Sequence, residues 1–130
     1  MLTSNTETTW SREYVWGLRL SHNLPEDYKE EVALIYQNCI EYSCDKEYDE
    51  IMTFVTKAFV ERNRQLEENV TIGQVKMKWG YLTIYHDGGR DPYLDEIIQT
   101  ASNMAESTKK KLDEMYGRGG FRRRKILQPN

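Results

Sequence analysis

Hydrophobic side chains recur every three or four positions along most of this chain, a spacing that predicts helices packed through one apolar face. We expect helices over residues 10–20 and 26–42, and a third that Asp45 caps and that fades after residue 66. The apolar stripe of the second helix consists of Tyr28, Val32, Ile35, Tyr36, Cys39 and Ile40, and that of the third consists of Tyr48, Ile51, Met52, Val55, Phe59, Arg62 and Leu66.

The hydrophobic period changes to two between residues 74 and 85, which predicts β-strands. Gly80 divides this stretch, so we expect a β-hairpin with its turn there; the alternative is one long strand with a bulge at Gly80. The apolar positions are Val75, Met77, Trp79, Leu82 and Ile84, and they alternate with Gln74, Lys76, Lys78, Tyr81, Thr83 and Tyr85.

A long C-terminal helix is expected from Asp91, its N-cap, and Pro92, its first residue, to Tyr116, with Gly117 as the stop. The sequence therefore predicts a mostly helical α+β fold with three helices, one β-hairpin and this long C-terminal helix. It predicts one domain over residues 10–116, a disordered N-terminus over 1–9 and a flexible basic tail over 117–130.

A two-stranded hairpin is marginally stable alone, so it needs helices to pack on or strands from a second chain. The second option closes an exposed edge, and we therefore expect a homo-oligomer.

Composition limits the classes of function. No apolar run approaches the ~20 residues of a membrane span, and the polar N-terminus lacks the features of a signal peptide, so we expect a cytoplasmic protein without a membrane partner. Cys39 and Cys44 have no cluster of His or Cys around them in the sequence, so we expect no metal site and no cofactor. Residues 1–116 carry a net charge of −8 and the tail carries +5, so an acidic body precedes a basic end.

The strand region reads Gln74-Val75-Lys76-Met77-Lys78-Trp79-Gly80-Tyr81-Leu82-Thr83-Ile84-Tyr85, followed by Gly88-Gly89 and by Tyr93-Leu94-Asp95-Glu96-Ile97-Ile98. This segment resembles a family of small uncharacterised proteins common in phage and prophage genomes, whose core looks like Gln-Val-Lys-x-Lys-aromatic-Gly-x-Leu-x-aromatic-Tyr. The family helix usually runs into a Cys-x-x-Cys segment that looks like a metal knuckle, whereas here lysines follow Ser107-Thr108 and no cysteine does. The resemblance covers roughly residues 74–107, and it implies a phage-related setting, in a host cytoplasm, without implying any chemistry.

Basic and aromatic side chains around the hairpin form a candidate site for a phosphate-bearing ligand. Lysines on one strand face, an arginine before a helix N-terminus and a Gly-Gly turn are features that hold anions. Asp87 and Asp91 flank the turn and oppose an anion there, and the alternative is an ordinary strand-to-helix connection with a solvated lysine face. The candidate ligand-binding residues are Lys76, Lys78, Tyr81, Tyr85, His86 and Arg90.

The basic tail is a second candidate, for nucleic acid. Arginines with an interleaved phenylalanine contact phosphates and stack on bases. The alternative is that the tail is solvated, or folds over the acidic body of its own or a neighbouring chain. The residues concerned are Arg118, Phe121, Arg122, Arg123, Arg124 and Lys125.

Catalysis is not expected. His86 and Asp87 are adjacent, and neighbours on a strand point to opposite faces, which argues against an acid–base pair. The sequence thus predicts a non-enzymatic, phage-type, counter-defence or host-directed protein that binds a nucleotide signal or nucleic acid. The alternative is an inhibitor or adaptor that binds a host protein through an acidic surface rich in tyrosine.

Overall fold

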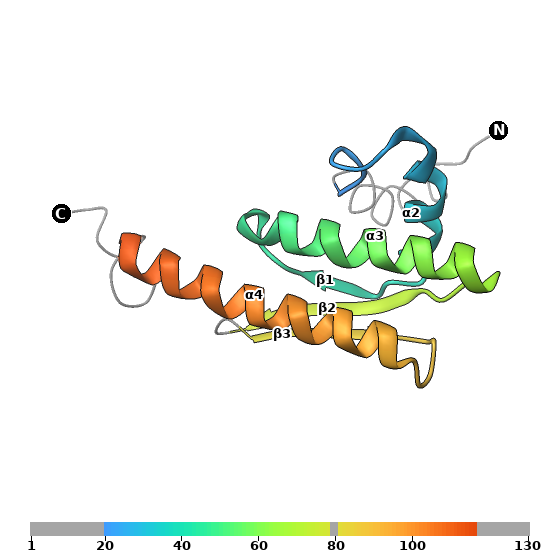
Figure 1. Cartoon of the computed structure of the whole chain (residues 1–130). Coiled ribbons are helices and arrows are strands. Elements are labelled where there is room, and N and C mark those ends of the chain that lie inside the picture. Colours follow the sequence, from blue (N-terminus) through green and yellow to red (C-terminus); the bar gives the residue numbers. More distant parts are fainter. Residues whose placement is uncertain (1–19, 79–80, 117–130) are drawn as a thin grey trace.

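The computed structural model describes residues 20–78 and 81–116, and Figure 1 shows the path of the chain. The predicted first helix, except Leu20, the N-terminus and the basic tail lie outside the described residues. The structure confirms a mostly helical α+β fold, with a three-stranded sheet where a two-stranded hairpin was expected. The elements in chain order are η1 (Glu26–Tyr28), α2 (Lys29–Ile35), β1 (Glu41–Ser43), η2 (Lys46–Tyr48), α3 (Asp49–Leu66), β2 (Ile72–Lys78), β3 (Tyr81–His86) and α4 (Pro92–Tyr116).

The second predicted helix is shorter than expected, and the prediction that it runs to residue 42 is wrong. Helix α2 ends at Ile35, and the N–H of Ile40 then donates to the carbonyl of Gly73 at 2.9 Å as β1 begins. Pairing with β2 satisfies backbone groups of this segment that the helix would have satisfied. Tyr36 and Cys39 are buried in the strand arrangement too, so their spacing could not distinguish the two, but Ile40 is 71% exposed.

Helix α3 lies between α2 and α4 in Figure 1, so two of its sides are covered. This position explains why its buried side chains extend beyond one stripe to Ala58 and Val60. Asp45 precedes η2 rather than α3, and its side chain makes no capping hydrogen bond, so the predicted cap at Asp45 is wrong.

The sheet has the order β1-β2-β3, and the predicted hairpin is confirmed. Strands β2 and β3 are antiparallel, with Lys78 opposite Tyr81, and the connection at 79–80 lies outside the described residues. Strands β1 and β2 are parallel and are joined through α3, because a parallel pair requires a long crossover. A register shift between Ile72 and Gln74 places an irregularity at Gly73.

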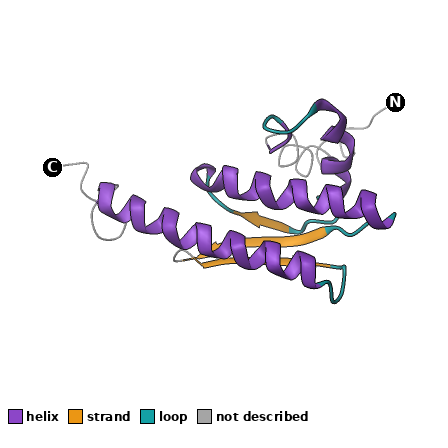
Figure 2. Cartoon of the chain, viewed as in Figure 1, coloured by secondary structure: helices purple, strands orange, loops and turns teal. Residues whose placement is uncertain are grey.

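Helices α3 and α4 lie along the strands in Figure 2 and cover one face of the sheet. The side chains that alternate toward these helices are buried, and they belong to the same core as Val55, Phe59 and Leu94. Because the side-chain period of a strand is two, burial of one face leaves the intervening side chains on the other face. The buried strand residues are Ile72, Val75, Leu82 and Ile84.

Helix α4 begins at Pro92 and extends to Tyr116, as predicted. Ala101 and Ala105 are fully buried one helical turn apart, and their small side chains allow α4 to approach its neighbours closely. Among the helices that the structure describes, none has the length and apolar character needed to span a bilayer.

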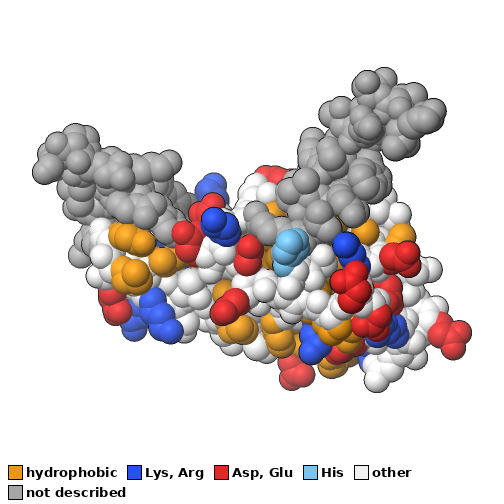
Figure 3. All heavy atoms as spheres, turned by 90° about the horizontal axis from the view of Figure 1, so that it is seen from above, with side chains coloured by type: hydrophobic (Ala, Val, Ile, Leu, Met, Phe, Trp, Pro, Cys, Tyr) orange, Lys and Arg blue, Asp and Glu red, His pale blue; other side chains and the backbone are white. Residues whose placement is uncertain are grey.

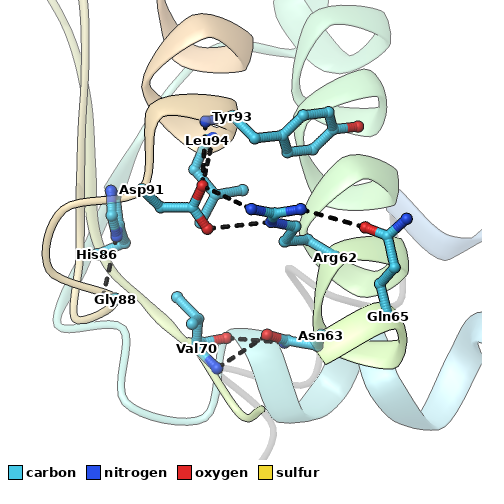
Figure 4. Close-up of polar contacts among 9 residues, drawn as sticks. All are labelled: Arg62, Asn63, Gln65, Val70, His86, Gly88, Asp91, Tyr93 and Leu94. Carbon is cyan, nitrogen blue, oxygen red and sulfur yellow. Dashed lines mark hydrogen bonds and ion pairs between the residues drawn. The ribbon is translucent and has the colours of Figure 1, made fainter. Parts of the chain in front are cut away.

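An ion pair between α3 and the start of α4 holds the two helices together (Figure 4). The Arg62 guanidinium donates to both carboxylate oxygens of Asp91, at 3.1 and 3.2 Å. The Asp91 carboxylate also accepts from the N–H groups of Tyr93 and Leu94, which confirms it as the N-cap of α4. The hydrogen bond from Arg62 is the main reason that the pKa of Asp91 lies below its usual value.

Part of the outer edge of β3 is covered by α4. The hydroxyl of Ser102 donates to the carbonyl of Leu82 at 3.2 Å. A covered carbonyl is one less acceptor for a strand from another chain. Homo-oligomer formation stays a prediction.

Candidate functional site

Side chains of β2 and β3 that alternate away from the helices form a surface that we call the open face. Tyr81 and Tyr85 are 66% and 57% exposed, although burial would be the ordinary state of such large rings. The open face consists of Gln74, Lys76, Lys78, Tyr81, Thr83 and Tyr85. It therefore unites four of the six predicted ligand-binding residues.

Cross-strand pairing fixes the layout of the open face. Lys78 is opposite Tyr81, and Lys76 is opposite Thr83. Strand geometry places the two tyrosines, four residues apart, about 14 Å from each other, and the two lysines about 7 Å from each other. The result is a surface with two separated rings on β3 and a row of two lysines on the neighbouring strand β2.

Strand β1 adds a negative charge to the other side of this surface. Glu41 is paired with Gln74, whose amide donates to its carboxylate at 2.6 Å, and the Ser43 hydroxyl donates at 3.0 Å. These hydrogen bonds, the Gln74 bond above all, lower the pKa of Glu41, so its carboxylate is ionised at neutral pH. An anionic ligand is therefore favoured toward Lys78 and Tyr81, away from Glu41.

His86 and Arg90 do not join the open face. The His86 ring lies on the helix side of β3, edge-to-face with Phe59 at 5.5 Å, and its Nδ1 accepts from the N–H of Gly88 at 3.1 Å. Arg90 is exposed in the loop before α4. The predicted grouping of these two residues with Lys76 and Lys78 is therefore not what the geometry shows.

The Gly-Gly turn has a structural reason that the sequence could not reveal. A Cβ atom on Gly88 would lie 2.9 Å from the Val70 side chain. The Val70 side chain therefore occupies the space that a side chain at position 88 would need. Gly89 has a φ of 65°, in the left-handed region that favours glycine. The Asp87 carboxylate accepts from the N–H and the hydroxyl of Thr71. These contacts stabilise the turn and oppose an anion there.

A shallow pocket of about 250 Å³ adjoins the open face at Tyr85. Its other lining residues are Asn38, Thr71, Gly73, His86 and Asp87. No sequence pattern singles out Asn38 or Gly73, because the pocket depends on the irregularity in β2 and on where β1 begins.

A larger cleft of about 650 Å³ lies at the C-terminal end of α3. Glu31, Glu67 and Glu68 line it together with Leu34, which is 50% exposed. Arg64 also lines it, and its guanidinium is bonded to Glu31 and to Asp27. Figure 3 shows acidic and basic side chains side by side over the face seen from above, so this surface carries charges of both signs.

The tail residues Arg118, Phe121, Arg122, Arg123, Arg124 and Lys125 lie outside the described residues. Among residues 20–78 and 81–116, no three His, Cys, Asp or Glu side chains come together as a metal site would require.

Comparisons with known proteins do not assign this chain to a family. No protein-family model matches the chain, and neither a curated protein nor a solved structure does. The resemblance to the phage and prophage family stays a prediction, and function has to be argued from the geometry.

Proposed function

We propose that this protein binds single-stranded nucleic acid on the open face, without catalysing a reaction. The observation that carries the proposal is the exposure of Tyr81 and Tyr85 on one face of the sheet, beside Lys76 and Lys78. Bases stack on exposed aromatic rings with about 1–3 kcal/mol per base, and lysines neutralise the phosphates between them. Sheet surfaces with exposed aromatic rings are a recurring solution for RNA.

An extended strand fits this surface better than a mononucleotide. The two tyrosines are about 14 Å apart, too far for one base to touch both rings. Stacking on both therefore needs a ligand with at least two bases, joined by a backbone that passes the lysines. Among the phosphate-bearing ligands that the sequence indicates, the structure therefore favours a nucleic acid strand over a mononucleotide.

We favour binding over catalysis because His86 and Asp87, which are adjacent in the sequence, each hydrogen-bond to a different part of the fold. His86 accepts from Gly88, while Asp87 accepts from Thr71, so the two side chains serve separate contacts. Sequestration of a host nucleic acid would suit the phage-related setting that the resemblance implies.

The lysines supply the first test. In fluorescence anisotropy with a single-stranded oligonucleotide of about ten nucleotides, the double variant Lys76→Ala/Lys78→Ala should lose about tenfold in affinity. The slope of log affinity against log salt should also become less negative by about 1.4.

The matched control removes two exposed lysines from helices. Lys57 lies on α3 and Lys110 on α4, so Lys57→Ala/Lys110→Ala changes net charge equally. An equal loss in both double variants would mean that charge alone, and not the open face, drives binding.

A protein partner is the second candidate, and the larger cleft favours it. The carboxylates of Glu67 and Glu68 and the exposed Leu34 suit a basic segment with an apolar residue, whereas Glu31 in the same cleft is bonded to Arg64. Charge reversal by Glu67→Lys/Glu68→Lys should then abolish capture of a host protein from nuclease-treated lysate while leaving oligonucleotide binding intact. Retained capture would exclude the cleft as the docking surface.

A further inference from the structure

The shallow pocket beside Tyr85 differs from the rest of the open face in being hollow. Gly73 stands where β2 shifts register, and its missing side chain leaves the pocket open. A Cβ there would lie 3.8 Å from the Tyr85 carbonyl, an ordinary contact, so steric exclusion does not require glycine. A longer side chain at this position would extend into the pocket that Gly73 lines.

The size of the pocket limits what it holds. Its volume of about 250 Å³ is below the roughly 300–1,000 Å³ of sites for whole small molecules. One planar ring system fits such a volume, and a complete nucleotide does not. The exposed Tyr85 lines the same pocket and offers a stacking surface.

The polar groups of the pocket favour one kind of ring edge. The Asp87 carboxylate is held by two hydrogen bonds from Thr71, at 2.7 and 3.0 Å, and each of its oxygens retains a lone pair. A carboxylate accepts from amino groups of bases, such as N4 of cytosine. Asn38 adds an exposed amide that can donate and accept.

The charges on the sheet favour one orientation of a bound strand. Asp87 and Glu41 carry negative charge at this end of the sheet, and Lys76 and Lys78 lie toward the hairpin turn. Phosphates are therefore repelled from the pocket and attracted along β2, while an uncharged base can enter the pocket.

We infer that this pocket is a base-selective subsite that takes one nucleobase with an exocyclic amine, in preference to uracil. This inference rests on the proposed function of the open face. It adds a specificity to that surface: Tyr85 stacks on the base, Asp87 and Asn38 contact its amino-bearing edge, and the lysines hold the backbone that follows.

The experiment compares oligoadenylate, oligocytidylate and oligouridylate of equal length by fluorescence anisotropy. The unmodified protein should bind the first two about tenfold more tightly than oligouridylate. Gly73→Leu should remove this preference by filling the pocket, while Gly73→Ala, whose Cβ the structure accommodates, should retain it. Asn38→Ala, at an exposed side chain, should weaken the preference without loss of folding, which circular dichroism checks.

The outcomes separate the two proposals. Equal affinity of the unmodified protein for all three oligonucleotides would overturn the subsite and leave the open face as a general binding surface. An undiminished preference in both Gly73→Leu and Asn38→Ala would place the selectivity elsewhere and also overturn it. Binding of none of the three would overturn the proposed function, and the subsite with it.

Discussion

The open face and the turn at residues 86–91 both carry polar and charged side chains, but the structure uses them differently. In the turn, Asp87 binds Thr71, Asp91 caps α4, and Gly88 packs against Val70. On the open face, Tyr81 and Tyr85 project from the sheet and are more than half exposed. Residue type marks both regions as candidates, but only the open face leaves its aromatic rings exposed, and the turn adds to it no more than the two side chains that line the shallow pocket, His86 and Asp87.

Removal of the Asp91 carboxylate should cause the largest effect, and on stability alone. Asp91→Ala removes the cap of α4 and leaves Arg62 without its partner, so we expect a loss of about 2 kcal/mol in the free energy of unfolding. Urea unfolding measures it. Unchanged stability would contradict the structural role of Asp91 in joining α3 to α4.

The same carboxylate predicts a dependence on pH. The pKa of Asp91 is lowered in the folded protein, so the ionised carboxylate makes its full contribution to the free energy of unfolding at neutral pH. This contribution is lost as the pH falls below about 4, the pKa of an unperturbed Asp, and through the lower pKa of the folded state. Asp91→Asn should therefore lose less stability on acidification than the unmodified protein. Equal acid sensitivity of the two proteins would contradict the role given to the ion pair.

Substitution of the turn glycine should have the next largest effect. A Cβ in Gly88→Ala would lie 2.9 Å from Val70, and this overpacking should cost about 1–2 kcal/mol of stability. Gly73→Ala is the matched control, since its Cβ makes only ordinary contact. Thermal unfolding compares the two variants, and equal melting temperatures would remove the distinction between the two glycines.

The smallest effect is expected at the acidic side of the open face. Glu41→Gln removes a negative charge but keeps a group that can bond to Gln74 and Ser43. Oligonucleotide affinity at low salt should rise about twofold, and the gain should vanish at high salt. A loss of affinity would indicate instead that the carboxylate contacts the ligand.

Periodicity predicted most of the fold because the long elements bury clear stripes. The alternation through Val75, Leu82 and Ile84 identified both hairpin strands, and Asp91 with Pro92 identified the start of α4. Strand β1 was missed because three residues are too few for a period to emerge, and Tyr36 and Cys39 fit a helix equally well.

Strand alternation also predicted part of the candidate site, but not the contacts between residues that are distant in sequence. Alternation placed Lys76, Lys78, Tyr81 and Tyr85 on one face, as the structure has them. It could not show that His86 packs on Phe59, or that Gly88 is filled by Val70, because both partners are distant in sequence. The pocket at Gly73 likewise depends on the arrival of β1, which no local pattern shows.

The most direct measurement is the oligonucleotide affinity of the double variant Tyr81→Ala/Tyr85→Ala by fluorescence anisotropy. Loss of two stacking surfaces should weaken binding by at least about tenfold, while the free energy of unfolding changes by no more than about 0.5 kcal/mol. Met115→Ala, at a side chain 69% exposed on α4, serves as the control and should bind normally. Affinity equal to that of the unmodified protein in the double variant would contradict the claim that the open face binds nucleic acid.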